Sequence, residues 1–172
     1  MIAAKHYSGL LYRALNPIYA HHPLSGRGAE LHGGRFNPKG VPALYASTSP
    51  MTALREANQV GALQPATLIA YQADTSPIFD TRDDPGLTPY SMTSDDLAAN
   101  TWRDEMRAFG QSKTQKFARR LIDEGYAGII AQRFARGSSS ASINVVLWRW
   151  SDALPTKLVV VDDDGRLKST AV

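Results

Sequence analysis

The chain has 172 residues, a length typical of one domain and sufficient to bury a core without help from a metal or a disulfide. It contains no cysteine, which excludes disulfides, thiolate metal sites and a cysteine nucleophile. Hydrophobic residues make up 43% of the chain and charged residues 20%, as in ordinary globular proteins. We therefore expect a single domain over residues 1–172.

The charge balance bears on the ligands that the chain can bind. The formal net charge is +3, and 13 of the 19 basic residues are arginine. Arginine binds phosphate with a planar fork, so an anionic ligand and mere codon preference explain this composition equally well. The basic residues do not cluster, since Arg119 and Arg120 form the only adjacent pair, and we expect no direct binding of nucleic acid.

The apolar segments do not predict a membrane protein. No apolar run approaches the roughly 18 residues that a spanning helix needs. Lys5, His6 and Arg13 interrupt the N-terminal apolar stretch before the core of a signal peptide could form. We therefore expect no membrane association and a cytoplasmic location.

Glycine, proline and β-branched residues divide the first half of the chain into short elements. Ser49 followed by Pro50 is a helix start, because serine caps the first turn and proline fits the first helical position. The expected elements are a strand at 8–14, a loop without regular structure at 16–34, an extended piece at Phe36, a turn at 37–40, a strand at 43–46, a helix from Pro50 to about Val60 that stops at Gly61, and strands at 66–73 and 77–80.

The second half contains a clear amphipathic helix, in which Phe117, Ala118, Leu121 and Ile122 share one face. The expected elements are a loop at 81–93, a short helix from Thr93 or Ser94, the amphipathic helix at about 113–124, strands at 126–134, 142–150 and 157–162, and a turn at 163–165. Strands and helices mix without a regular βαβ alternation, which predicts the α+β class.

The segment from Leu24 to Gly40 is the most unusual, with five glycines and two arginines. Glycine lets the backbone approach a ligand closely, and arginine carries charge for phosphate groups. The segment has neither the Gly-Lys-Ser/Thr end of a Walker loop nor a strand-to-helix GxGxxG. A ligand-binding loop and a glycine-rich loop held by buried arginines both remain open.

Glu56 is a candidate functional carboxylate on the predicted helix. Ala53 and Ala57 lie on the same side of that helix, so the carboxylate is expected to point partly inward. A buried carboxylate needs a partner, which is either Arg13 or Arg35 in a structural ion pair or a ligand hydroxyl. The four histidines show no ligand spacing, so we expect no metal site.

Four motifs follow one another in the first part of the chain: Tyr12-Arg13, GGRFNPKG with Arg35, ALYAS with Tyr45 and ALREAN with Glu56. Their order and spacing resemble the first half of the RES domain, which supplies the toxins of Xre-RES toxin–antitoxin systems. The resemblance spans nearly the whole chain. Ser112, in GQSKTQKFARRLIDEGYAGII, occupies the place of the signature serine, and Asn144, in SINVVLW, resembles a recurrent asparagine of the family.

This resemblance implies a fold similar to ADP-ribosyltransferases of the diphtheria-toxin type, with two facing β-sheets flanked by helices and a cleft for NAD, the substrate. It implies a catalytic set of Glu56, Arg35, Tyr45 and Ser112, and an NAD-binding set of Arg13, Arg35, Tyr45, Ser112 and Asn144. Glu56 would stabilise an oxocarbenium-like centre, the arginines would bind pyrophosphate or ribose, Tyr45 would stack on nicotinamide, and Ser112 would be a positioning hydroxyl.

The resemblance also implies partners. A helix-turn-helix antitoxin of the Xre type would neutralise the chain, and phosphoribosyl pyrophosphate synthetase is the candidate acceptor of ADP-ribose. Transfer to a protein is the expected reaction, with NAD hydrolysis or phosphorolysis close behind. A ribonuclease-type toxin and a nucleotide-binding module without catalysis remain the other two classes.

Overall fold

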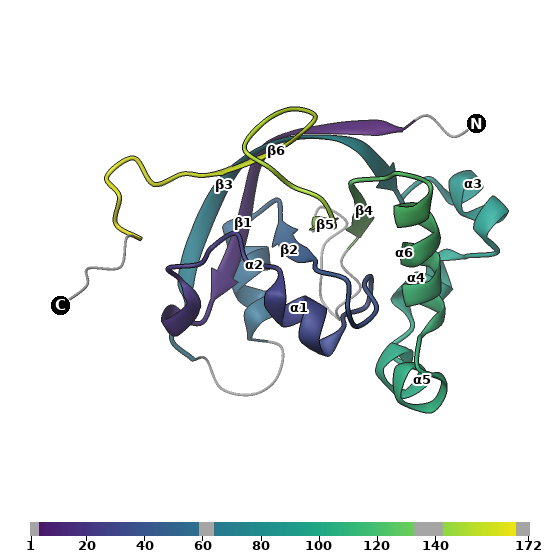
Figure 1. The fold of residues 1–172 in the computed structure, drawn as a ribbon. Helices are drawn as coiled ribbons and strands as arrows, with labels where there is room; N and C mark the ends of the chain where they lie inside the picture. Colours follow the sequence, from purple (N-terminus) through teal and green to yellow (C-terminus); the bar gives the residue numbers. More distant parts are fainter. Residues whose placement is uncertain (1–3, 59–63, 133–142, 168–172) are drawn as a thin grey trace.

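The computed structural model describes residues 4–58, 64–132 and 143–167, and these form a mixed structure of strands and helices (Figure 1). The strands are β1 (Lys5–Leu15), β2 (Leu44–Ser47), β3 (Thr67–Asp80), β4 (Gly128–Gln132), β5 (Ile143–Leu147) and β6 (Thr156–Val160). The α-helices are α1 (Arg27–His32), α2 (Pro50–Ala57), α3 (Asp84–Leu87), α4 (Ser94–Ala98), α5 (Trp102–Phe109) and α6 (Lys113–Asp123), and the 3₁₀ helices are η1 (Pro17–Tyr19) and η2 (Thr88–Tyr90). The predicted α+β class is confirmed.

The strands form one sheet in the order β1-β2-β5-β4-β3-β6, and an additional pairing of β1 with β3 closes five of them into a ring. The long strand β3 makes this closure possible, because its first part pairs with β1 and β6 and its end pairs in parallel with β4. The expected two facing sheets are therefore joined by continuous hydrogen bonding. Likeness to the ADP-ribosyltransferase fold stays a prediction.

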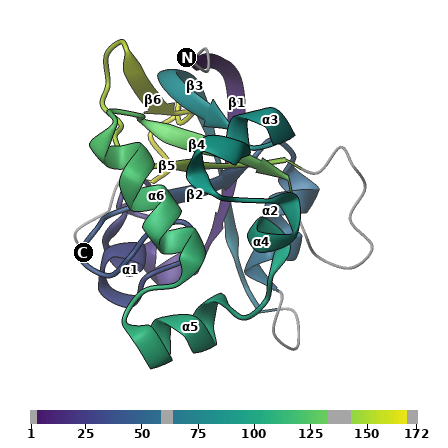
Figure 2. The same ribbon diagram turned by 90° about the vertical axis from the view of Figure 1, so that its right-hand side faces the viewer.

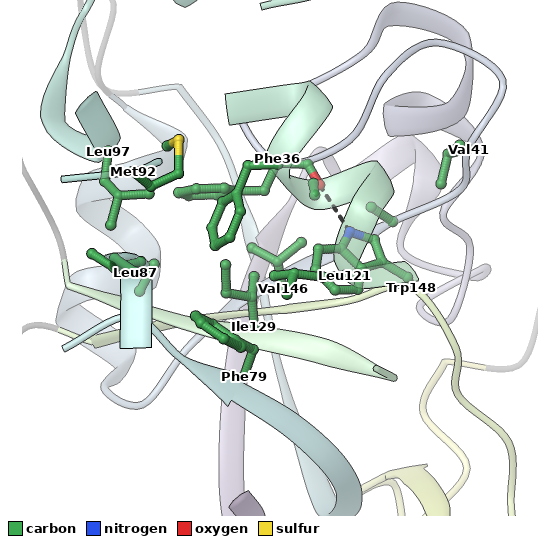
Figure 3. Close-up of a cluster of buried hydrophobic side chains, with 14 residues drawn as sticks. Phe36, Val41, Phe79, Leu87, Met92, Leu97, Leu121, Ile129, Val146 and Trp148 are labelled. Carbon is green, nitrogen blue, oxygen red and sulfur yellow. Dashed lines mark hydrogen bonds between the residues drawn. The ribbon is translucent and has the colours of Figure 1, made fainter. Parts of the chain in front are cut away.

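Two apolar clusters fill the molecule. The inner core lies inside the ring and gathers buried residues of β1, β3, β5 and β6, among them Leu11, Tyr71, Val145 and Leu158. The helical core lies on the outer face of β4 and β5 beneath α6, which runs beside β4 in both views (Figure 1, Figure 2). Its side chains come from strands, helices and the segment after α1 (Figure 3), and they include Phe36, Phe79, Phe117, Leu121, Ile129, Val146 and Trp148.

Several predicted elements differ from the structure. The prediction of a loop without regular structure at 16–34 is wrong, because η1 and α1 lie there. Asn16 caps η1 by accepting a hydrogen bond from the Ile18 N–H at 3.1 Å, a local signal that the glycine and proline count obscured. The expected loop at 81–93 likewise contains α3 and η2.

The two strands expected at 66–73 and 77–80 are one strand, β3. Pro77 is tolerated within it because the β1–β3 register shifts at this point and β4 becomes a partner from Ile78 onward. Helix α5 lies in a segment for which the sequence predicts no element. It begins after Thr101 and ends at Phe109, and Gly110, whose φ of 81° favours glycine, caps it.

Three other elements are shorter than expected. Helix α2 ends at Ala57, β4 begins at Gly128 and β5 ends at Leu147. The expected helix end at Val60 and Gly61, and the strand residues expected at 133–134 and 142, lie outside the described residues. Across 4–58, 64–132 and 143–167, no helix is long and apolar enough to cross a membrane.

Candidate active site

A pocket of about 280 Å³ lies between β1, β2, α2 and β5. Its wall combines two tyrosine rings with a guanidinium, a carboxylate, an amide, a serine hydroxyl and small aliphatic groups. The lining residues are Tyr12, Arg13, Ala14, Tyr45, Ala46, Ser47, Ala53, Glu56, Ala57 and Asn144. Four of the six predicted site residues are thus brought together, and the other two, Arg35 and Ser112, do not line the pocket.

Strand register and a helix cap assemble the polar part of this wall. Ser47 of β2 pairs with Tyr12 of β1 on one side and with Asn144 of β5 on the other. Helix α2 begins at once after β2, because the Ser49 side chain accepts a hydrogen bond from the Thr52 N–H at 3.3 Å. The cap fixes the start of α2, and Glu56 follows almost two turns later, opposite the strands.

Glu56 is half-buried, and its Oε1 accepts a hydrogen bond from the Asn144 Nδ2 at 3.5 Å. Ser47, which is 3% exposed, donates its hydroxyl hydrogen to the Asn144 Oδ1 at 2.7 Å. This second bond determines which end of the amide faces Glu56. Ser47 was not predicted as a site residue, although its place one strand period after Tyr45 in ALYAS could have indicated it.

The Tyr45 hydroxyl is anchored away from bulk water. It donates to the Asn37 Oδ1 at 2.7 Å and accepts from the Phe36 N–H at 3.0 Å. Burial raises the pKa of Tyr45 well above its usual range, and the Phe36 N–H and the Arg35 charge oppose that rise only in part. The phenol therefore stays neutral, and the ring, held by its hydroxyl, is presented to the pocket.

Arg35 lies beside the pocket in the turn between Gly34 and Asn37, and its guanidinium reaches the end of α4. Its Nη1 donates to the Leu97 and Ala99 carbonyls at 2.8 and 2.7 Å. Burial, together with the nearby Arg103 charge, lowers the pKa of Arg35, while Tyr45 and Glu56 oppose that shift. The guanidinium remains charged at neutral pH, and its Nη2 also donates to the Asn100 Oδ1 at 3.4 Å.

Arg13 binds the segment around Pro23 and Ser25, next to the pocket. Its Nη1 donates to the Pro23 and Ser25 carbonyls at 3.3 and 3.0 Å. The Tyr71 hydroxyl donates to the same Pro23 carbonyl at 2.6 Å. Arg13 is half-buried, lines the pocket and ties β1 to the segment at Pro23 and Ser25.

Ser112 is fully buried and caps α6. Its Oγ accepts a hydrogen bond from the Gln115 N–H at 3.1 Å and shares another with the Thr114 hydroxyl at 3.0 Å. In return, the Gln115 Oε1 accepts from the Ser112 N–H at 3.0 Å, which completes a capping box. Ser112 therefore holds a helix start in place and does not face the pocket.

The arrangement suits stabilisation of a positive centre on a sugar. A carboxylate oriented by an amide stabilises developing positive charge, and an anchored aromatic ring offers a stacking face. Within the described parts of the chain, no group of three or more acidic or histidine side chains could hold a metal ion. The pocket lining contains no histidine, so the described wall offers no imidazole for acid–base chemistry.

The sequence profile of the RES domain matches residues 10–169. No curated protein matches the chain significantly. The matched range includes every residue that lines the pocket.

Proposed function

This chain belongs to the RES domain family, and we propose that it cleaves the bond between nicotinamide and ribose in NAD. RES domains are toxins of toxin–antitoxin pairs, and the family is associated with NAD processing. The observation that carries the proposal is the hydrogen-bonded series Ser47–Asn144–Glu56 in the wall of the pocket. It places an oriented carboxylate beside a stacking ring.

The size of the pocket supports one part of NAD as its occupant. Pockets for whole drug-sized ligands hold roughly 300–1,000 Å³, and about 280 Å³ is near the lower end. The nicotinamide-ribose end matches this volume better than the whole dinucleotide. In the proposed complex, nicotinamide stacks on Tyr45, while the pyrophosphate lies toward Arg35 or Arg13, whose charges favour phosphate.

The proposed reaction breaks the bond between the ribose C1′ and the nicotinamide nitrogen, and nicotinamide leaves with the bonding electron pair. The C1′ becomes oxocarbenium-like, as in glycoside cleavage. Glu56 stabilises this charge and accepts a hydrogen bond from a ribose hydroxyl, and Asn144 holds the carboxylate and contacts the ribose. An acceptor then donates a lone pair to C1′ and loses its proton.

The proposed acceptor is a protein, with phosphoribosyl pyrophosphate synthetase as the candidate that the family suggests. Water or phosphate in its place would make the chain an NAD glycohydrolase or an NAD phosphorylase. The proposed antitoxin is a helix-turn-helix protein of the Xre type. These partners follow from the family alone.

Exchange of Glu56 for glutamine tests the cleavage step. Glu56→Gln keeps the shape of the side chain and removes its charge, so nicotinamide release should fall by about 100-fold or more. The melting temperature should change by only about 2 °C, because Glu56 is half-buried. Glu30→Gln, which removes a carboxylate paired with Arg27 on α1, is the matched control and should retain full activity. Near-normal nicotinamide release by folded Glu56→Gln would show that Glu56 does not have the proposed role.

The acceptor is tested with NAD that carries a label in its ADP-ribose part. Purified protein is incubated with this NAD, with and without phosphoribosyl pyrophosphate synthetase. Transfer predicts label on the synthetase and slow turnover in its absence. Rapid release of free ADP-ribose or ADP-ribose phosphate without labelled protein would overturn the transferase and support hydrolysis or phosphorolysis.

A further inference from the structure

Gln115 is a fully buried polar residue whose amide is hydrogen-bonded at both ends. Its Oε1 completes the capping box with Ser112. Its Nε2 donates to the carbonyls of Gly34 at 2.9 Å and Asn37 at 3.2 Å. A capping box needs only the oxygen of the N3 side chain. The amide hydrogens of Gln115 therefore hold a second structure, 81 and 78 residues away in the sequence.

That second structure is the turn that carries Arg35. Gly34 and Asn37 are bridged to each other, since the Gly34 N–H donates to the Asn37 carbonyl at 2.9 Å. The two carbonyls that Gln115 binds thus bracket Arg35 and Phe36. Gln115 closes this turn from the side of α6.

Tyr45 of β2 also binds this turn, through its bonds to the Phe36 N–H and the Asn37 Oδ1. The Asn37 Nδ2 extends the network to the carbonyls of Ala29 and Val41, at 2.8 and 2.9 Å. The fit is close, because a Cβ at Gly34 would overlap the Tyr45 hydroxyl and the Asn37 Oδ1. A displacement of the turn therefore moves Arg35 and disturbs the anchor of the Tyr45 ring together.

We infer that Gln115 is a positioning residue, whose amide sets the turn that places Arg35 beside the pocket and holds the Tyr45 ring in the pocket wall. This inference rests on the proposed cleavage of NAD there. It also gives Ser112 an indirect role, because Ser112 caps α6 and thereby orients Gln115. Neither Ser112 nor Gln115 lines the pocket, so both act through the turn.

The test compares two buried substitutions in the first turn of α6. Gln115→Met keeps the size of the side chain and removes all its hydrogen bonds to the turn. Thr114→Val is the matched control, since Thr114 is 2% exposed and its side chain contacts the Ser112 hydroxyl but not the turn. Well below both melting temperatures, Gln115→Met should lower kcat/KM for NAD by about 10- to 100-fold, because misplaced groups cost this much. Thr114→Val should retain kcat/KM within about twofold.

A double-mutant cycle separates positioning from general damage. Because part of the effect of Gln115 acts through Arg35, the loss of kcat/KM caused by Gln115→Met should be at least about threefold smaller in an Arg35→Ala background. The inference would be overturned if the loss of kcat/KM in the double variant equalled the product of the two single losses. Equal losses in Gln115→Met and Thr114→Val would overturn it as well.

Hydrogen exchange at the Phe36 amide gives a readout without NAD. This amide is bonded to the Tyr45 hydroxyl, and its exchange should accelerate about 10-fold or more in Gln115→Met but not in Thr114→Val. Unchanged exchange in Gln115→Met overturns the positioning role. An inactive wild-type protein would contradict the proposed function, while the exchange result would still decide the role of Gln115. Should Gln115→Met not fold, Gln115→Glu keeps an acceptor for the capping box and replaces the donor with a carboxylate oxygen that repels the Gly34 and Asn37 carbonyls, so it is expected to show the same acceleration.

Discussion

The inner core and the helical core are held together in different ways. The inner core is built from strand side chains such as Leu11 and Val145, both wholly buried, and any well-packed apolar set satisfies such a site. The helical core packs beside buried polar groups, and Asn37 and Gln115, both 0% exposed, are hydrogen-bonded there to main-chain carbonyls. Buried polar groups must be paired, so they fix positions that packing leaves free. The inner core stabilises the scaffold, and the polar part of the helical core positions the site.

Truncation of the inner core should have the largest effect on stability. Leu11→Ala removes a fully buried side chain and leaves a cavity, so the free energy of unfolding should fall by about 2–5 kcal/mol. NAD cleavage per folded molecule should stay unchanged, since Leu11 does not line the pocket. Urea unfolding and assays at low temperature measure both quantities. A 10-fold loss of activity per folded molecule would mean that the two cores are not separable.

Two tyrosines with hydrogen-bonded hydroxyls, the half-buried Tyr45 and the fully buried Tyr71, allow a direct comparison of hydroxyl groups. Tyr45→Phe leaves the Phe36 N–H and the Asn37 Oδ1 without this partner, and unfolding free energy should fall by about 1–3 kcal/mol. Tyr71→Phe in the inner core should cost less, because its acceptor, the Pro23 carbonyl, still accepts from Arg13. Urea unfolding of both variants gives the ranking. Equal losses of unfolding free energy in the two variants would show that polar groups are no more important in the helical core than in the inner core.

The smallest effect is expected at Ser47. Ser47→Ala removes the bond that orients the Asn144 amide toward Glu56, which should cost about 0.5–1.5 kcal/mol, or roughly 2- to 10-fold in kcat/KM. Thr48→Val is the control, because the Thr48 hydroxyl contacts the Ile143 carbonyl and does not line the pocket. Steady-state kinetics of nicotinamide release compare the two. Equal kcat/KM for Ser47→Ala and the wild type would show that the amide keeps its orientation without Ser47.

Local patterns predicted the parts of the site that depend on one element. The start of α2 and the inward side of Glu56 followed from Ser49-Pro50 and from helical periodicity. The α+β class and the family resemblance also came from the sequence, and the profile match confirmed the resemblance.

Contacts between distant segments could not be predicted in this way. Gln115 has no pattern that indicates Gly34, and Ser47 has none that indicates Asn144, because each bond depends on how the chain folds back on itself. Ser112 was placed in the catalytic set from its position alone. Its burial and its role as a cap are properties of the folded helix start.

The closure of the ring also sets the order in which the site is completed during translation. Ser47 and Asn144 are separated by 97 residues, and a ribosome needs roughly 5 to 20 s to add that many. Over most of that interval the growing chain contains Glu56 but not the amide that faces it in the folded protein. β5 supplies this amide and joins β2 to β4 in the ring, so the same strand completes the scaffold and the pocket. A nascent chain that ends before Asn144 therefore has the carboxylate but lacks the opposite wall.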